Sequence, residues 1–227
     1  MDHTKELTFA LETVSKACVI TSLVQSQHEK IVKHTKNDRS PVTIADYATQ
    51  AYIGKALADF EPAPHLAAEE DSVALRQAAN AHLMQGIQEA LQPVWSSAHP
   101  SDIVDAIDVG KHDGLSGRFW TLDPIDGTKG FLRGGQYAIS MALIEDGEVT
   151  CGVLGCPNLS SDLNRPFDDP DPTGNIFFAT SSITTRSIQV GQDFRDAKPV
   201  RASAGLKTEA IRICESVEAA HSNFSDS

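Results

Sequence analysis

The chain has 227 residues, 41% of them hydrophobic and 22% charged, which is enough for one large domain or two small ones with an apolar core. Its formal net charge of -12 argues against nucleic acid as a partner, because binding a phosphate backbone needs clustered Lys and Arg side chains. The chain has no long uncharged apolar run, and its charged N-terminus lacks the features of a signal peptide. We therefore expect a cytoplasmic protein that does not span a membrane.

Two helices are predicted at the start of the chain. Apolar residues recur at helical spacing from about residue 5 to 30. The polar segment that follows indicates a loop, and a second helix is expected to begin at Thr43, whose side chain can cap it. Pro62 and Pro64 end this helix shortly after Phe60.

A short strand and two further helices are predicted next. The apolar run HLAA fits a strand that ends at Glu69. Residues 73–91 carry a rough apolar stripe that predicts a third helix. A shorter fourth helix is expected to run from a cap at Ser101 to Gly110.

Strands are predicted in the second half of the chain. Residues 118–123 and 175–180 are short apolar strands, and residues 137–156 predict two strands joined by a hairpin turn at Asp146 and Gly147. A long polar loop rich in Asp and Pro precedes the last of these strands. Helices followed by a meander of strands predict an α+β fold.

Four cysteines are scattered through the chain, and we expect them to be reduced packing residues. Two of them form a C-x4-C pair inside an apolar segment, but no second pair of ligands completes a zinc site. The four are Cys18, Cys151, Cys156 and Cys214.

The stretch TLDPIDGTKGFLRGGQ, residues 121–136, contains the clearest candidate site. Asp123 is expected at the end of a strand, where Pro124 turns the chain and Gly127 allows a positive φ. The carboxylates of Asp123 and Asp126 can then face one point, which suits a hard cation such as Mg²⁺, while the backbone amides after them suit phosphate. The alternative is an Asx-type turn whose aspartates are only solvated.

The sequence D-P-I-D-G-T resembles the motif of the inositol monophosphatase superfamily, the lithium-sensitive, Mg²⁺-dependent phosphomonoesterases. The resemblance implies that Asp123, Asp126 and the carbonyl oxygen of Ile125 bind metal. It also implies that the amides of Gly127 and Thr128 contact the phosphate group of the substrate. Mg²⁺ ions would then be the cofactors, and Li⁺ would inhibit the enzyme.

The family also has an upstream G-E-E segment whose first glutamate binds metal. The segment AAEED offers Glu69 for that role, with Ala68 where the family has glycine. Without the resemblance, Glu69 and Glu70 would be interpreted as an exposed acidic pair before a helix.

A helix start of the form T-x-x-D supplies a further residue in this family, an aspartate that pairs with the threonine of the motif to activate the attacking water. The matching residues here are Asp46 and Thr128. The alternative is that Thr43 and Asp46 form a capping box at the start of the second helix.

The finer resemblance is to the 3'(2'),5'-bisphosphate nucleotidases of this superfamily. SPVTIADYATQ and GRFWTLDPIDGTKGFLRGGQYAISMALIEDGEVTCGVLGCPNL look like that subfamily, and residues 129–133 distinguish it from inositol monophosphatases, whose motif continues T-x-N-F. The resemblance implies hydrolysis of the 3'-phosphate of 3'-phosphoadenosine 5'-phosphate, with 3'-phosphoadenylyl sulfate as a second candidate substrate, in sulfur assimilation or nucleotide detoxification. His221 and Ser222 match a stretch that contacts the nucleotide, although a histidine near a chain end is often only exposed.

The resemblance also implies an αβαβα sandwich of two domains, from which the chain departs at its C-terminus. Family members continue well beyond this point and carry a W-D-x-A-x-G motif there, whereas neither Trp95 nor Trp120 precedes an aspartate. We therefore assign residues 1–200 to an α+β metal- and phosphate-binding domain. Residues 201–227 are assigned to the start of a second, largely missing α/β domain.

Three functions remain as alternatives. The first is an active nucleotidase with a small-molecule nucleotide substrate. The second is a catalytically impaired, truncated form that acts only as a metal-binding or interaction fragment and can self-associate through an exposed apolar face. The third is an inositol phosphate phosphatase, against which the segment Lys129-Gly130-Phe131 argues.

Overall fold

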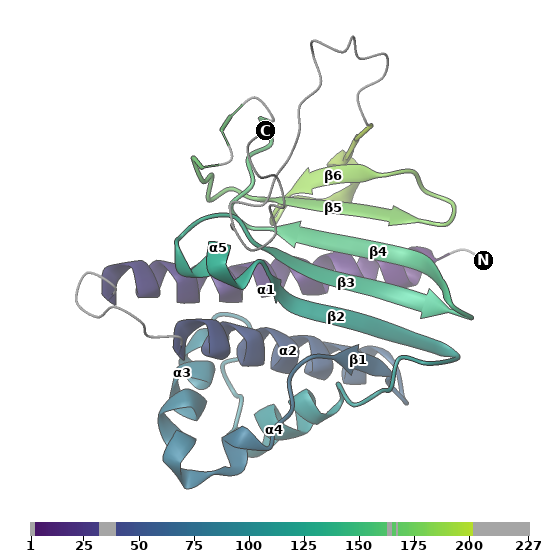
Figure 1. The fold of residues 1–227 in the computed structure, drawn as a ribbon. Helices are drawn as coiled ribbons and strands as arrows, with labels where there is room; N and C mark the ends of the chain where they lie inside the picture. The colour runs from purple at the N-terminus through teal and green to yellow at the C-terminus, as the bar shows by residue number, and fades with distance from the viewer. Residues whose placement is uncertain (1–2, 32–39, 163–164, 167, 202–227) are drawn as a thin grey trace, which may run out of the picture.

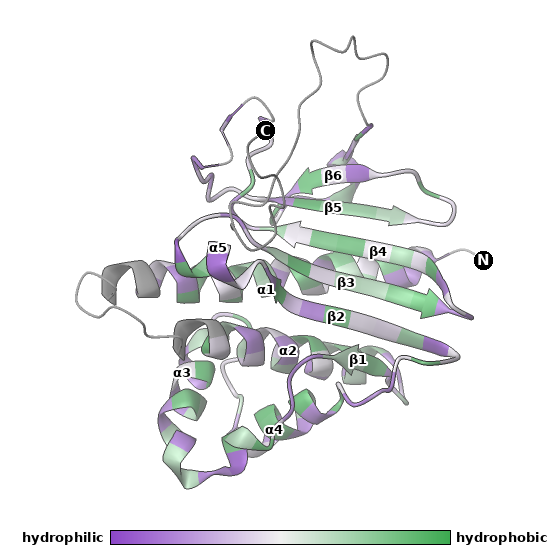
Figure 2. Ribbon diagram, in the orientation of Figure 1, coloured by the Kyte–Doolittle hydropathy of each residue, from purple (hydrophilic) through white to green (hydrophobic). Residues whose placement is uncertain are grey.

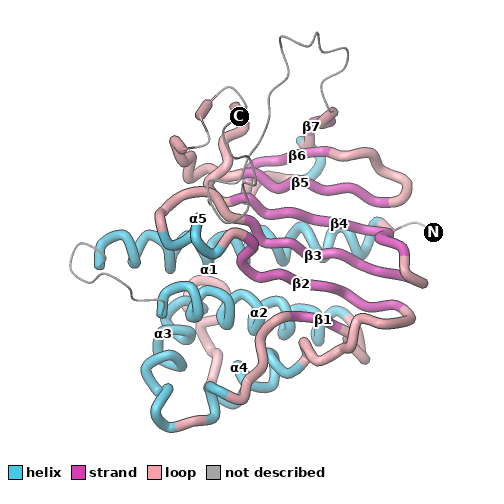
Figure 3. Tube along the Cα trace, in the orientation of Figure 1, coloured by secondary structure: helices cyan, strands magenta, loops and turns pink. Residues whose placement is uncertain are grey.

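The structure, a computed structural model, describes residues 3–31, 40–162, 165–166 and 168–201 (Figure 1). The sequence predictions made for Cys214, His221, Ser222 and the second domain lie outside these residues. The two long N-terminal helices pack against one face of a seven-stranded sheet whose strands lie side by side in chain order, and two shorter helices pack against the second of them (Figure 3). Helices followed by strands in a single sheet confirm the predicted α+β class.

The elements of the described chain have the following bounds. The helices are α1 (Thr4–Ile31), α2 (Ser40–Phe60), α3 (Ala81–Leu91), α4 (Pro100–Asp108) and α5 (Thr128–Leu132). The strands are β1 (Leu66–Ala68), β2 (Arg118–Asp126), β3 (Ala138–Glu145), β4 (Glu148–Cys156), β5 (Asn175–Thr180), β6 (Arg186–Gln189) and β7 (Lys198–Pro199).

The sheet is antiparallel except at one edge, where β1 and β2 run parallel. The predicted hairpin between β3 and β4 is confirmed. Its two turn residues have positive φ angles, 51° at Asp146 and 84° at Gly147. These angles are typical of a turn that matches the twist of the two strands, and Asp and Gly reach them at low cost.

The core lies between the helices and the sheet and draws its buried residues from both layers. Figure 2 shows hydrophobic residues along the helices as well as the strands. Trp120 of β2 is fully buried and meets Phe9 of α1 edge to face, with ring centroids 5.6 Å apart. Helix α1 approaches β4 so closely that a Cβ atom on Gly155 would lie 2.6 Å from Val14 and 2.8 Å from the Cys18 sulfur. Each large apolar side chain buried in this way contributes about 1.5–3 kcal/mol to stability.

Helix α1 is a core helix. By length and composition alone, Thr4–Gln27 is long and apolar enough to cross a membrane, but 56% of this apolar stretch is buried inside the protein. The cysteines Cys18, Cys151 and Cys156 are buried free thiols, as predicted. Burial raises the pKa of both Cys151 and Cys156 to about 11, so these thiols are neutral at physiological pH.

The start of α2 differs from the prediction. The helix begins at Ser40, three residues before Thr43, so Thr43 lies inside the first turn and is not the N-cap. Pro41 follows the first helical residue, where its missing N–H costs nothing because that amide has no partner within the helix. The capping-box interpretation of Thr43 and Asp46 is therefore wrong, and Asp46 requires another explanation.

Two other helix boundaries also differ from the prediction. Residues 73–91 do not form one helix, because Gln77 adopts an extended conformation that leaves two short 3-10 turns before α3. The fourth helix begins at Pro100 and not from a cap at Ser101. The backbone N–H of His99 donates to the Asp102 carboxylate at 3.1 Å, which satisfies a donor that the first turn leaves open.

Candidate active site

The parallel pairing of β1 and β2 places two acidic segments at one end of the sheet. Ala68, the last residue of β1, pairs with Leu122 of β2, so Glu69, the first residue after β1, lies level with Asp123 of β2. Because parallel strands end on the same side of a sheet, residues 54 positions apart in sequence become neighbours. This confirms the predicted strand before Glu69, and only the pairing shows why it matters.

The sequence predicts that the strand ends at Asp123, but β2 continues to Asp126. Asp123 pairs with Ser140 and Asp126 with Ala138, so β2 contains one more residue than β3 over this interval. Residues three apart in a regular strand point to opposite faces, and one extra residue restores them to the same face. The irregularity therefore lets the side chains of Asp123 and Asp126 serve one site.

The turn after β2 has the geometry that the motif predicts. Gly127 adopts a φ of 92°, and helix α5 begins at the next residue, Thr128. The backbone N–H of Ile125 donates to the Asp123 carboxylate at 3.1 Å, which is the Asx-type turn of the alternative interpretation. The turn and the acidic cluster are therefore features of the same structure and do not exclude one another.

Asp46 of α2 completes the cluster. It is half-buried, and burial together with the negative charges of Glu70, Glu69 and Asp123 raises its pKa to about 8. The pKa of Asp123 is also raised, by burial and by the charges of Asp126 and Glu69. Carboxylates from α2, the end of β1 and the end of β2 are therefore close enough to repel one another.

The hydroxyl of Thr128 donates to the carbonyl oxygen of Ile125 at 3.5 Å. Among the contacts of the described residues there is no hydrogen bond between Thr128 and Asp46, so their pairing stays a prediction. Thr128 and Asp126 are exposed, whereas Ile125 is buried. The exposed side chains and the turn amides thus remain accessible to a ligand from solvent.

Two residues that the sequence analysis missed hold the acidic segment in place. Gln50, four residues after Asp46 on α2, accepts a hydrogen bond from the Glu70 N–H at 2.9 Å and donates to the Glu70 carbonyl at 2.6 Å. The buried Tyr47 side chain lies close enough to the Glu70 carboxylate for the two groups to shift each other's pKa. Positions 46, 47 and 50 share one side of a helix, and this spacing in DYATQ was the available signal.

The segment after α5 is anchored by buried amides. Gln25 of α1 donates to the Phe131 carbonyl at 2.9 Å, and Asn158 donates to the Gly135 carbonyl at 2.7 Å and to Gln25 at 2.8 Å. The Gln136 side chain donates to the Asn158 carbonyl at 2.9 Å. These bonds fix the turn that follows the motif against the core, so α5 has little freedom to move.

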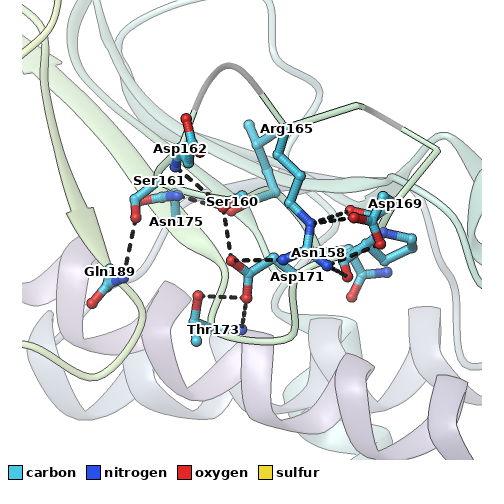
Figure 4. Close-up of polar contacts among 12 residues, drawn as sticks. Asn158, Ser160, Ser161, Asp162, Arg165, Asp169, Asp171, Thr173, Asn175 and Gln189 are labelled. Atoms are coloured by element: carbon cyan, nitrogen blue, oxygen red, sulfur yellow. Dashed lines mark hydrogen bonds and ion pairs between the residues drawn. The ribbon is translucent and has the colours of Figure 1, made fainter.

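The second acidic segment of the chain, the loop before β5, has a structural role (Figure 4). Asp171 accepts hydrogen bonds from the Ser160 hydroxyl at 2.7 Å and from the Thr173 hydroxyl at 2.8 Å. These bonds lower the pKa of Asp171 to about 2. Arg165 pairs with Asp169 at 2.8 Å. The carboxylates of Asp169 and Asp171 thus bind groups of the loop itself, which distinguishes them from the acidic cluster at the ends of β1 and β2.

The donor set at this edge fits Mg²⁺ in its chemistry. It consists of carboxylates (Glu69, Asp123 and Asp126) and one carbonyl oxygen, that of Ile125, which are the ligands that hard cations prefer. Within the described residues, no three His, Cys, Asp or Glu side chains are placed to hold an ion in the present arrangement. The raised pKa values of Asp46 and Asp123 nevertheless show an excess of negative charge that a cation would offset.

Ala68 stands where the resemblance predicts glycine, and the structure shows how its methyl group is accommodated. The residue that faces it is Gly110, whose carbonyl accepts the Ala68 N–H at 3.2 Å. A Cβ atom on Gly110 would lie 3.0 Å from the Ala68 methyl carbon. The glycine therefore leaves the space that Ala68 occupies.

Comparison with known proteins places the whole described fold in one family. The sequence profile of the inositol monophosphatase family matches residues 3–222. A 3'(2'),5'-bisphosphate nucleotidase from Candida albicans is 34% identical, with 99% of this chain and 68% of the relative covered. The 3'(2'),5'-bisphosphate nucleotidase from Schizosaccharomyces pombe is 37% identical, with 98% of this chain and 66% of the relative covered. A 3'(2'),5'-bisphosphate nucleotidase from Arabidopsis thaliana is 36% identical, with 98% of this chain and 67% of the relative covered.

Solved structures share the fold at low sequence identity. CysQ from Bacteroides thetaiotaomicron, a bacterial member of the inositol monophosphatase family, aligns with a TM-score of 0.53 at 17% identity over 89% of this chain and 60% of its own. The inositol monophosphatase from Anabaena aligns with a TM-score of 0.52 at 15% identity over 90% of this chain and 52% of its own. The chain thus spans about two thirds of the length of these nucleotidases and a little over half of the length of these structures.

The family match runs through both the sheet and its acidic edge, and the nucleotidases align with nearly the entire chain. We conclude that this protein belongs to the inositol monophosphatase family and, within it, to the 3'(2'),5'-bisphosphate nucleotidases.

Proposed function

We propose that the chain is a Mg²⁺-dependent phosphomonoesterase that removes the 3'-phosphate of 3'-phosphoadenosine 5'-phosphate and releases AMP and phosphate. The observation that carries the proposal is the cluster of Asp46, Glu69 and Asp123, in which burial and mutual repulsion raise the pKa of two of the acids. Neighbouring carboxylates with perturbed pKa values are typical of a catalytic site. The names of the relatives supply the substrate class.

The proposal assigns a role to each group of the acidic edge. Glu69, Asp123, Asp126 and the carbonyl of Ile125 would hold Mg²⁺. A bound Mg²⁺ would neutralise charge on the phosphate oxygens and lower the pKa of a coordinated water. The net charge of -12 supports this assignment, because the protein would otherwise repel an anionic nucleotide.

Asp46 would act as the general base, with Thr128 as its partner. A general base is most effective when its pKa is near the working pH. The pKa of Asp46 is about 8 in the metal-free protein, and the positive charge of bound Mg²⁺ would lower it from there. The amides of Gly127 and Thr128 would contact the phosphate group. His221 and Ser222 stay in the proposal as nucleotide contacts on the strength of the resemblance alone. A cytoplasmic location also stays a proposal, on the sequence features that predicted it.

Phosphate release from 3'-phosphoadenosine 5'-phosphate tests the proposal. The purified chain is assayed with Mg²⁺, with and without Li⁺, beside an Asp123→Asn variant and beside inositol 1-phosphate as a second substrate. We expect turnover of the nucleotide that Li⁺ inhibits and that the variant loses. Preference for inositol 1-phosphate would contradict the proposed substrate. Absence of turnover from folded protein would contradict the proposed activity and leave the binding-fragment alternative.

A further inference from the structure

We propose that Gln50 is a positioning residue that holds Glu69 in place for the metal ion by fixing the backbone of Glu70. The inference rests on the proposed function, because it gives Glu69 the role of a metal ligand. Gln50 itself contacts neither metal nor substrate, and its action passes through the peptide bond between Glu69 and Glu70.

The carboxamide of Gln50 is fully buried and makes three hydrogen bonds to the backbone. Its oxygen accepts the Glu70 N–H at 2.9 Å, and its nitrogen donates to the Glu70 carbonyl at 2.6 Å. The same nitrogen donates to the Ile107 carbonyl at 3.1 Å. One side chain thus pairs with both polar backbone groups of Glu70 and ties them to the end of α4.

This pairing determines the orientation of Glu69. Strand β1 ends at Ala68, so the ladder of the sheet no longer constrains the next residue. The N–H of Glu70 and the carbonyl of Glu69 belong to one planar peptide group, so holding that N–H also orients the Glu69 carbonyl. The hydrogen bonds of Gln50 therefore hold the backbone just after β1, where the sheet no longer does.

The same contact connects Glu69 to the proposed base. Gln50 lies four residues after Asp46, which places both on one face of α2. The distance between the helix and the end of β1 is thus set one turn from Asp46 by direct hydrogen bonds. If the carboxamide were lost or displaced, no direct hydrogen bond would hold Glu69 and Asp46 in a fixed relative position.

The space for the carboxamide depends on Gly110. A Cβ atom at this position would lie 2.7 Å from the Gln50 side-chain nitrogen and 3.1 Å from the Ile107 carbonyl oxygen. Any larger residue would push the amide away from its acceptors. Gly110→Ala therefore perturbs the same contact without removing Gln50.

The test is a double-mutant cycle between Gln50→Met and Glu69→Gln. The readout is the Mg²⁺ concentration needed for half of the metal-induced rise in melting temperature, measured without substrate. We expect Gln50→Met to raise this concentration about 10–100-fold, the usual cost of losing a group that orients a ligand. In the Glu69→Gln background the same change should have no further effect.

The matched control is Gln88→Met. Gln88 is a half-buried glutamine on α3 that donates to the Ala98 carbonyl at 3.1 Å. It should lower stability in EDTA slightly and leave the Mg²⁺ response unchanged. If Gln50→Met does not fold, Gly110→Ala takes its place in the cycle with the same expectation.

The proposal is overturned if Gln50→Met changes the half-saturating Mg²⁺ concentration equally in the unmodified chain and in the Glu69→Gln variant. Gln50 would then only stabilise the fold. The absence of any Mg²⁺ response in the unmodified chain would overturn the proposal as well. The assay is independent of turnover. Coupling in the cycle without phosphate release would therefore reject the proposed activity while supporting the role of Gln50.

Discussion

Asp123 and Asp126 are three residues apart on β2, yet their partners on β3, Ser140 and Ala138, are only two apart. The extra residue brings two aspartates to one side of a strand that would otherwise direct them to opposite faces. Together with the parallel neighbour β1, this irregularity creates the acidic edge of the sheet.

Removing either aspartate should weaken the response to Mg²⁺. We expect Asp123→Asn and Asp126→Asn each to raise the half-saturating Mg²⁺ concentration roughly tenfold or more, because each removes a charged oxygen donor. Melting temperature against Mg²⁺ concentration measures the effect. Asp105→Asn, an exposed aspartate on α4, carries the same change in charge and should behave like the unmodified chain. A similar loss in Asp105→Asn would indicate bulk electrostatics instead of a site.

Asp46 should make the metal-free protein less stable at alkaline pH. Its pKa is raised from 3.8 to about 8 by burial and by the acids around it, so the folded state binds the proton more tightly than the unfolded state. The protonated Asp46 carboxyl therefore contributes its full stabilisation below about pH 4, and this stabilisation is lost as the pH rises through about 8.

Asp46→Asn removes this dependence. In EDTA at pH 9 we expect the variant to have a higher melting temperature than the unmodified chain, by about 2–4 °C for each kcal/mol recovered. At pH 5 the two melting temperatures should be close. Melting curves at the two pH values measure the difference. An equal change at both pH values would contradict the electrostatic explanation. The same variant should lose phosphate release if Asp46 is the base.

Gly130 is required by the close return of the chain after α5. A Cβ atom there would lie 1.9 Å from the Gln136 carbonyl oxygen, which is backbone and cannot move aside freely. We expect Gly130→Ala to lower the free energy of unfolding by about 2–4 kcal/mol. Gly152→Ala is the matched control, because nothing lies within 4 Å of its Cβ position. Urea unfolding compares the two, and equal stabilities would contradict the predicted clash.

Arg118 joins three carboxylates at the other end of β2. It contacts Glu61 at 2.7 Å and both Glu6 and Glu145 at 3.2 Å. Because the side chain is 38% exposed, we expect Arg118→Met to cost only about 1–2 kcal/mol, and less in high salt, which screens the interactions. Urea unfolding at two salt concentrations tests this. A cost independent of salt would assign the effect to packing.

The sequence was sufficient for the parts of this protein that depend on local patterns. The first helix, the hairpin at Asp146 and Gly147, and the positive φ of Gly127 follow from helical periodicity and from the conformational range of Asp and Gly. The motif itself predicted a cation and phosphate site between Asp123 and Thr128. These features depend on residues close together in the chain, whose interactions the sequence displays directly.

Only the tertiary structure decided how these parts form a site. The continuation of β2 to Asp126 depends on its register with β3, and the proximity of Glu69 depends on the parallel pairing of β1. The start of α2 at Ser40 removed the capping role of Thr43 and left Asp46 for the site. The hold of Gln50 on Glu70 joins residues 20 apart in sequence. Such contacts are set by the packing of helices on a sheet, and packing depends on the whole core rather than on any segment of the chain.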